Sequence, residues 1–230
     1  MQAKRLFSFF AGCFLVMGVH AVPDDGFVHR LTLTEGDKFE FETLQFVETK
    51  EIRYRVHSRN FLNVLSAVGD EYSLETVNRD LVFAIEGGRD TYLPSTTTTV
   101  RQRSDGKVLE IKNDLSADAG RFAKNPNNFR YPLTPVGVGG HWDNLVPADP
   151  ALGTPETIIR YVVSGRKMWR GFDVLVVDFM NDSSIETPMP MRGTTYIDGA
   201  TGLSVYTEAY FENHTKGEAM RSSFRMQIKS

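Results

Sequence analysis

The stretch "MRSSFRMQIK" at positions 220–229 carries the clearest structural signal in this chain. Its residues alternate between an apolar or small set and a charged or polar set. Successive side chains of a β-strand point to opposite faces of a sheet, so the alternation predicts a strand with one buried and one solvated face. The same period of two recurs over residues 52–59 and 203–211. We therefore expect an antiparallel sheet with one apolar face.

The Gly69-Asp70 turn sequence predicts a hairpin between two apolar strands. A two-residue loop there places Leu65 opposite Leu74 and Ala67 opposite Tyr72. Apolar side chains then meet across the pair, which makes this register self-consistent.

Asp105-Gly106 predicts a second hairpin by the same reasoning. A two-residue loop pairs Val100 with Ile111, Gln102 with Leu109 and Arg101 with Glu110. The last of these is an opposite-charge pair, which favours the register.

The predicted fold is mainly β, with about ten antiparallel strands and one or two short helices. The nearly continuous apolar run at 171–180 is typical of a central strand buried on both faces, and residues 116–124 could form a short helix that begins at a Ser N-cap. Strand blocks at about 27–115 and 155–229 are joined by a loop-rich linker. One curved sheet, as in an unclosed barrel, and two packed sheets both fit this pattern.

Residues 1–21 have the charged start, apolar run and small-residue end of a secretory signal peptide. We expect an exported, periplasmic or secreted protein whose residues 22–230 form a single β-rich domain without a transmembrane segment. Lipidation of Cys13 is the alternative to its removal with the signal peptide. Cleavage after Ala21 changes the formal net charge from −3 to −5, and no basic block points to nucleic acid.

The sequence lacks the common signatures of enzymes, metal sites and nucleotide-binding loops. We therefore expect no cofactor, no metal and no catalytic residue. His141 with Asp143 is the one pair that would suit a hydrolase, and Asp178 is a further candidate because it interrupts an apolar strand.

Residues 131–145 gather two prolines, three glycines and Trp142. The prolines favour extended chain and the glycines allow positive φ, so the segment predicts a turn that leads into a strand. Trp142 would then fill the core where that strand starts.

Four segments resemble the recurring segments of uncharacterised secreted bacterial β-proteins. These are "LTLTEGDKFEFET" (31–43), "YPLTPVGVGGHWDN" (131–144), "VSGRKMWRGFDVLVVDF" (163–179) and "GTTYIDGATGLSVYTEAYFE" (193–212). The architecture of those proteins is similar to the periplasmic lipoprotein carriers of the LolA/LolB-like superfamily. The resemblance implies an unclosed antiparallel barrel with short helices near its mouth, and it implies lipid carriage.

Three functions remain open. The first is a non-enzymatic exported β-protein that binds a lipid or another apolar ligand on a concave sheet face. The residues expected on that face or its rim are Tyr54, Leu65, Leu74, Trp142, Phe179, Met189 and Met191. The second is a structural or interaction domain of the cell envelope without a ligand, and the third is the hydrolase. Oligomeric state is not indicated by the sequence.

Overall fold

A computed structural model describes residues 30–113, 129–147, 156–181, 190–213 and 220–229. These residues form twelve antiparallel strands and no helix. The strands are β1 (Lys38–Glu48), β2 (Arg53–Val68), β3 (Glu71–Ile85), β4 (Asp90–Leu93), β5 (Thr96–Arg103), β6 (Val108–Asn113), β7 (His141–Val146), β8 (Thr157–Trp169), β9 (Phe172–Asn181), β10 (Met191–Asp198), β11 (Ser204–Asn213) and β12 (Met220–Ile228). The predicted helix at 116–124 and the signal peptide lie outside the described residues.

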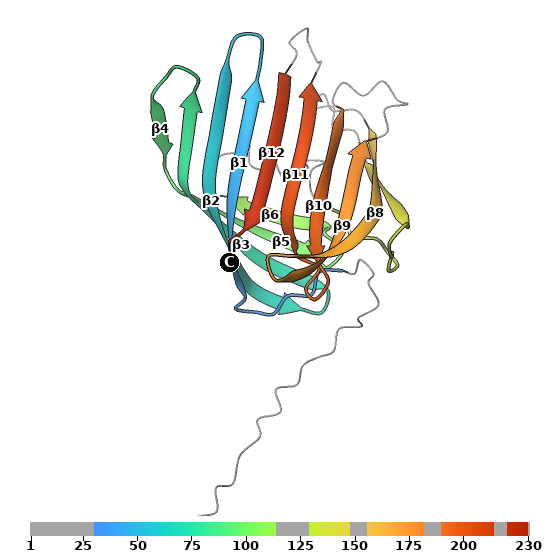
Figure 1. Cartoon of the computed structure of the whole chain (residues 1–230). Coiled ribbons are helices and arrows are strands. Elements are labelled where there is room, and N and C mark those ends of the chain that lie inside the picture. The colour runs from blue at the N-terminus through green and yellow to red at the C-terminus, as the bar shows by residue number, and fades with distance from the viewer. Residues whose placement is uncertain (1–29, 114–128, 148–155, 182–189, 214–219, 230) are drawn as a thin grey trace, which may run out of the picture.

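All twelve strands belong to one sheet, in the order β6-β5-β3-β2-β1-β12-β11-β10-β9-β8-β7, with β4 paired to β3. Both predicted strand blocks therefore contribute to a single unclosed sheet, and two packed sheets do not form. The C-terminal strand β12 joins the blocks, because it pairs with β1 on one side and with β11 on the other. Figure 1 shows the sheet curving so that β5 and β6 lie behind the upright central strands.

The strand count exceeds the predicted ten, and two of the strands carry weak sequence signals. Strand β4 has only four residues, and all of them are exposed. With no buried face, its sequence does not alternate between apolar and polar residues. Strand β7 lies inside the segment that we predicted to be a loop-rich linker. The turn before it forms as expected, with Gly139 at a φ of 86° and a hydrogen bond from the Gly140 N–H to the Gly137 carbonyl.

The β2–β3 hairpin turns at Gly69-Asp70 and pairs Ala67 with Tyr72, as predicted. Leu74, however, pairs with Val64 and not with Leu65. A β-bulge between Val64 and Ser66 inserts one extra residue into β2, which shifts the pairs from Val64 to Arg59 by one before a second irregularity restores the register.

In the β5–β6 hairpin, a longer loop and a bulge shift the register in opposite directions and cancel. Its loop is longer than two residues, since the Gly106 N–H bonds to the Arg103 carbonyl and the Arg103 N–H bonds to the Lys107 carbonyl. Gln102 consequently pairs with Val108, not with Leu109. A bulge after this pair restores the predicted partners, Arg101 with Glu110 and Val100 with Ile111.

The apolar run at 171–180 forms β9 between β8 and β10, and its first half is buried on both faces. Val174, Leu175 and Val177 have at most 2% of their surface exposed. The strand leaves the core toward its end, since Met180 is 54% exposed.

One end of the curved sheet is closed by packing. Leu31 and Leu33, which precede β1, are buried against Tyr72, and the Tyr72 hydroxyl donates to the Leu31 carbonyl at 3.0 Å. Tyr131 reaches the same end from the linker and donates its hydroxyl to the Gly202 carbonyl at 2.6 Å. These segments tie the β5–β6 turn to the β10–β11 turn, so the sheet holds its curvature at this end.

We call the face that carries the core clusters the inner face and the other the outer face. In β12 the inner face bears Ser222, Phe224, Met226 and Ile228, and the outer face bears Arg221, Ser223, Arg225 and Gln227. The burial of Ser222 and Ile228 confirms the alternation predicted from the C-terminal sequence.

Candidate functional site

Charge is separated between the two faces of the central sheet. Alternation along β1, β2, β11 and β12 places every Asp, Glu, Lys, Arg and His of these strands on the outer face. The inner face of the same strands carries only apolar and uncharged polar side chains. Any molecule on the inner face therefore meets a surface with no ionised group from these four strands.

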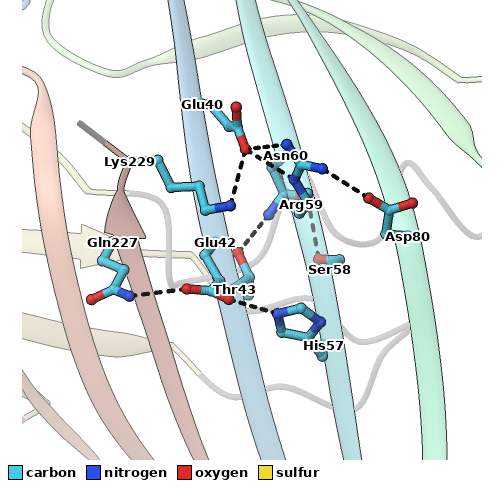
Figure 2. A network of polar contacts seen from close by, with 10 residues as sticks. All are labelled: Glu40, Glu42, Thr43, His57, Ser58, Arg59, Asn60, Asp80, Gln227 and Lys229. Atoms are coloured by element: carbon cyan, nitrogen blue, oxygen red, sulfur yellow. Dashed lines mark hydrogen bonds and ion pairs between the residues drawn. The ribbon is translucent and has the colours of Figure 1, made fainter.

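The outer charges neutralise one another in cross-strand contacts, as Figure 2 shows for β1, β2 and β12. The Glu40 carboxylate accepts two hydrogen bonds from Arg59, at 2.9 and 2.7 Å, and Lys229 lies 3.3 Å away. The Arg59 hydrogen bond is the main reason that the pKa of Glu40 is lowered. Glu42 bridges His57 at 2.9 Å and Gln227 at 3.1 Å. Such partly exposed ion pairs are typical of a sheet face that contacts solvent.

A cavity of about 1250 Å³ lies at the end of the sheet where β1, β9 and β11 finish and β2, β10 and β12 begin. Its volume is above the range of about 300–1,000 Å³ that is usual for small-molecule sites. Side chains from both faces of these strand ends line it. Eight of the lining residues are charged: Glu48, Arg53, Arg55, Glu86, Asp90, Arg192, Glu212 and Arg221.

One transverse row of inner-face side chains runs along the cavity. Neighbouring strands contribute Ile85, Tyr54, Val47, Ser222, Phe211 and Met191, each paired in register with the next. Of these, Ile85 is 43% exposed, Tyr54 and Phe211 are half-buried, and the other three are buried. The accessible part of this row is thus aromatic and aliphatic, while charged side chains line other parts of the cavity.

Two of the predicted site residues, Tyr54 and Met191, line this cavity together. Sequence reasoning missed Ile85 and Phe211, although both continue the inner alternation of their strands. That alternation was the available signal, but only the register shows that these side chains share a row with Tyr54. Met189 lies outside the described residues.

Leu65 and Leu74 lie elsewhere. Leu74 is 6% exposed and belongs to the core at the closed end, while Leu65 is the extra residue of the β2 bulge and is 46% exposed. The structure therefore does not bring this pair to the cavity.

Trp142 and Phe179 lie in an aromatic cluster on the inner face of β7, β8 and β9. Trp142 stacks on Tyr161 with ring centroids 4.9 Å apart, and Phe179 lies 6.1 Å from the same ring. Burial raises the pKa of Tyr161 to about 12. Met191 and Phe211 pack with this cluster, which connects it to the cavity wall.

The residues considered for catalysis lie on the outer face. His141 and Asp143 are both exposed in β7, and both Asp143 oxygens bond to Arg160, at 2.9 and 3.1 Å. Asp178 is half-buried and accepts a hydrogen bond from the Thr194 hydroxyl at 2.6 Å. Neither acid lines the cavity.

Within the described part of the chain, no cluster of His, Cys, Asp or Glu has the arrangement of a metal site. The described residues also contain no helix with the length and apolar character that spanning a membrane requires.

Comparison with known proteins yields one relevant similarity. The chain is similar to the crystal structure of a DUF1329 family protein from Desulfovibrio piger, with 11% sequence identity, coverage of 85% of both chains and a TM-score of 0.25. No protein-family model matches the sequence, and no curated protein matches it.

Proposed function

We propose that this protein is an exported, non-enzymatic binding protein that holds the apolar chain of a lipid or similar amphiphile against the inner face of its sheet. The observation that supports this function best is the cavity of about 1250 Å³, in which an uncharged inner-face row forms one part of the lining and charged side chains of the same strand ends form another. An acyl chain gains about 25 cal/mol for each Å² of apolar surface that it buries, and it forms no hydrogen bonds that the wall would need to match.

The separation of charge supports the same ligand class. A fully packed structural domain would also place its charges outside, but it would not need an accessible aromatic and aliphatic row at the open end of the sheet. Ile85 combines 43% exposure with a position in the cavity wall, which suits a residue that a ligand covers.

Binding of an uncharged fluorescent acyl ester to the purified protein tests the proposal. Ile85→Glu should weaken binding about tenfold or more, because it places a charge where the chain must be desolvated. Ile52→Glu is the matched control, since Ile52 is 45% exposed and lies outside the cavity wall. Equal affinity of both variants, or no binding by the native protein, would rule the proposal out.

A further inference from the structure

A row of side chains crosses the outer face at the end of the sheet that holds the cavity. We call it the outer row. Its members are paired in register from β3 to β9 and all line the cavity: Ala84, Arg55, Phe46, Ser223, Tyr210, Arg192 and Met180. Phe46, Tyr210 and Met180 are 49%, 46% and 54% exposed. Large apolar side chains that gather in one exposed patch mark interaction sites, whereas scattered ones do not.

The outer row also carries two positive charges and no negative one. Arg55 and Arg192 are exposed, and neither has an ion pair in the part of the chain that the structure describes. The Arg192 guanidinium lies 6.0 Å from the centre of the Tyr210 ring, within reach of a cation–π contact. Four strand spacings of about 4.8 Å separate the two arginines, so their backbones lie about 19 Å apart across the sheet.

The next row toward the strand ends pairs its own charges. Arg53 lies 2.7 Å from Glu48 and 3.7 Å from Glu86, and Arg221 lies 3.8 Å from Glu212. The acids of that row are therefore held by arginines of the same row. The two guanidinium groups of the outer row stay available to an external anion.

This composition selects one kind of partner. A second copy of the chain is unsuited, because a two-fold interface would place one positive row against another. The surface of an anionic lipid bilayer complements both parts of the row, since its phosphates attract arginine and its interfacial region accepts aromatic rings. Because the row lines the cavity, a bilayer at this position would also adjoin the space that the proposed function assigns to an acyl chain.

We propose that the outer row docks this protein on the surface of an anionic lipid bilayer. Arg55 and Arg192 bind headgroup phosphates through charge-assisted hydrogen bonds. Phe46, Tyr210 and Met180 contact the interfacial region between these two anchors. The docking surface goes beyond the proposed function, since it requires no ligand in the cavity.

Co-sedimentation of the purified protein with lipid vesicles tests this inference. In about 0.1 M salt, the native protein should bind phosphatidylglycerol-rich vesicles about tenfold or more tightly than phosphatidylcholine vesicles, and added salt should reduce the preference. The double variant Arg55→Glu, Arg192→Glu should lose about tenfold or more in affinity for the anionic vesicles, because it replaces attraction with repulsion.

The double variant Lys107→Glu, Arg170→Glu is the matched control. It changes the net charge by the same amount at two exposed positions in the β5–β6 and β8–β9 turns, which lie at the other end of the sheet. Its affinity for the anionic vesicles should change by less than about threefold, because the screening length at this salt concentration is about 10 Å.

The apolar part of the row has a test of its own. Phe46→Ser should weaken binding to the anionic vesicles about threefold or more, and added salt should not abolish this difference, because the lost contact is apolar. Met168→Ser is the control, since Met168 is 68% exposed near the β8–β9 turn, and it should leave the affinity unchanged.

The outcomes keep the two proposals apart. Equal binding to both vesicle types, no binding to either, or an equal loss in the two double variants would overturn the docking surface. Binding to polyglutamate without binding to vesicles would also overturn it and would make the row a site for an acidic protein. Titration with the fluorescent acyl ester contains no bilayer, so it decides the proposed function independently.

Discussion

Gly193 shows how one residue without a side chain shapes the inner face. It lies in β10 opposite Phe179 of β9 and Ala209 of β11. A Cβ atom at this position would overlap the Glu208 carbonyl oxygen and lie 2.5 Å from the Phe179 ring. The ring therefore covers the space above the glycine, and this close approach orients Phe179 toward Tyr161. A glycine inside a strand pattern signals such an approach but does not identify the ring that uses it.

Gly193→Ala should lower the free energy of unfolding by about 2 kcal/mol, because the added methyl group meets backbone atoms that cannot move aside cheaply. Gly165→Ala is the control, since a Cβ atom there has no neighbour within 4 Å. It should change the free energy of unfolding by less than about 0.5 kcal/mol. Urea unfolding of both variants measures the difference, and equal stabilities would contradict the close approach.

At the scale of the element, β3 is a strand with two successive partners. Its residues 71–78 pair with β5 and its residues 81–84 pair with β4. Asp80 lies at the change, with a φ of 51°, where β3 carries one residue more than β2 between two paired positions, and its carboxylate lies 3.3 Å from Arg59. Bulges increase the local twist of a strand. The bulge at Asp80 therefore turns residues 71–78 of β3 away from β4. The strand itself was predictable from its alternation, whereas the bulge depends on partners that lie elsewhere in the sequence.

Replacing Asp80 tests the role of the left-handed backbone there. Asp80→Val should lower the free energy of unfolding by about 1–3 kcal/mol, because β-branched residues disfavour positive φ. Asp80→Gly should cost less than about 1 kcal/mol, since it removes only an exposed ion pair and relaxes the backbone.

Asp90→Val serves as the control for that series, since Asp90 is an exposed strand residue with negative φ. Chemical denaturation should find this variant as stable as the native protein. If Asp80→Val is equally stable, the strained backbone contributes nothing to the position of β3.

At the scale of the whole molecule, the sheet holds aromatic hydroxyl groups away from water at its closed end and along its inner face. Burial raises the pKa of Tyr161 to about 12 and raises the pKa of Tyr131 as well. In the unfolded chain both groups lose their protons near the ordinary tyrosine pKa of 10. The unfolded state therefore loses protons first, and the free energy of unfolding must fall as the pH rises from about 10 to about 12.

Alkaline titration of stability measures this linkage. Tyr161→Phe should make the fall in the urea midpoint between pH 10 and 12 shallower, although the variant loses the hydrogen bond to the Arg130 backbone. Tyr92→Phe should leave the slope unchanged, because Tyr92 is 77% exposed. A native protein whose stability is constant over this range would show that Tyr161 is not buried as described.

The sequence alone determined the local features of this protein. Alternation predicted the strands and their inner and outer faces, and Gly-Asp and Asp-Gly turns predicted two hairpins, because these signals depend only on neighbours in the chain. Tertiary structure decided the rest. Ladder pairing joined β12 to β1, which lies almost 180 residues earlier, and bulges shifted the register by one residue at several points. Only that register brought Tyr54, Ile85, Phe211 and Met191 into one row beside the cavity, because the row depends on which strands meet in space.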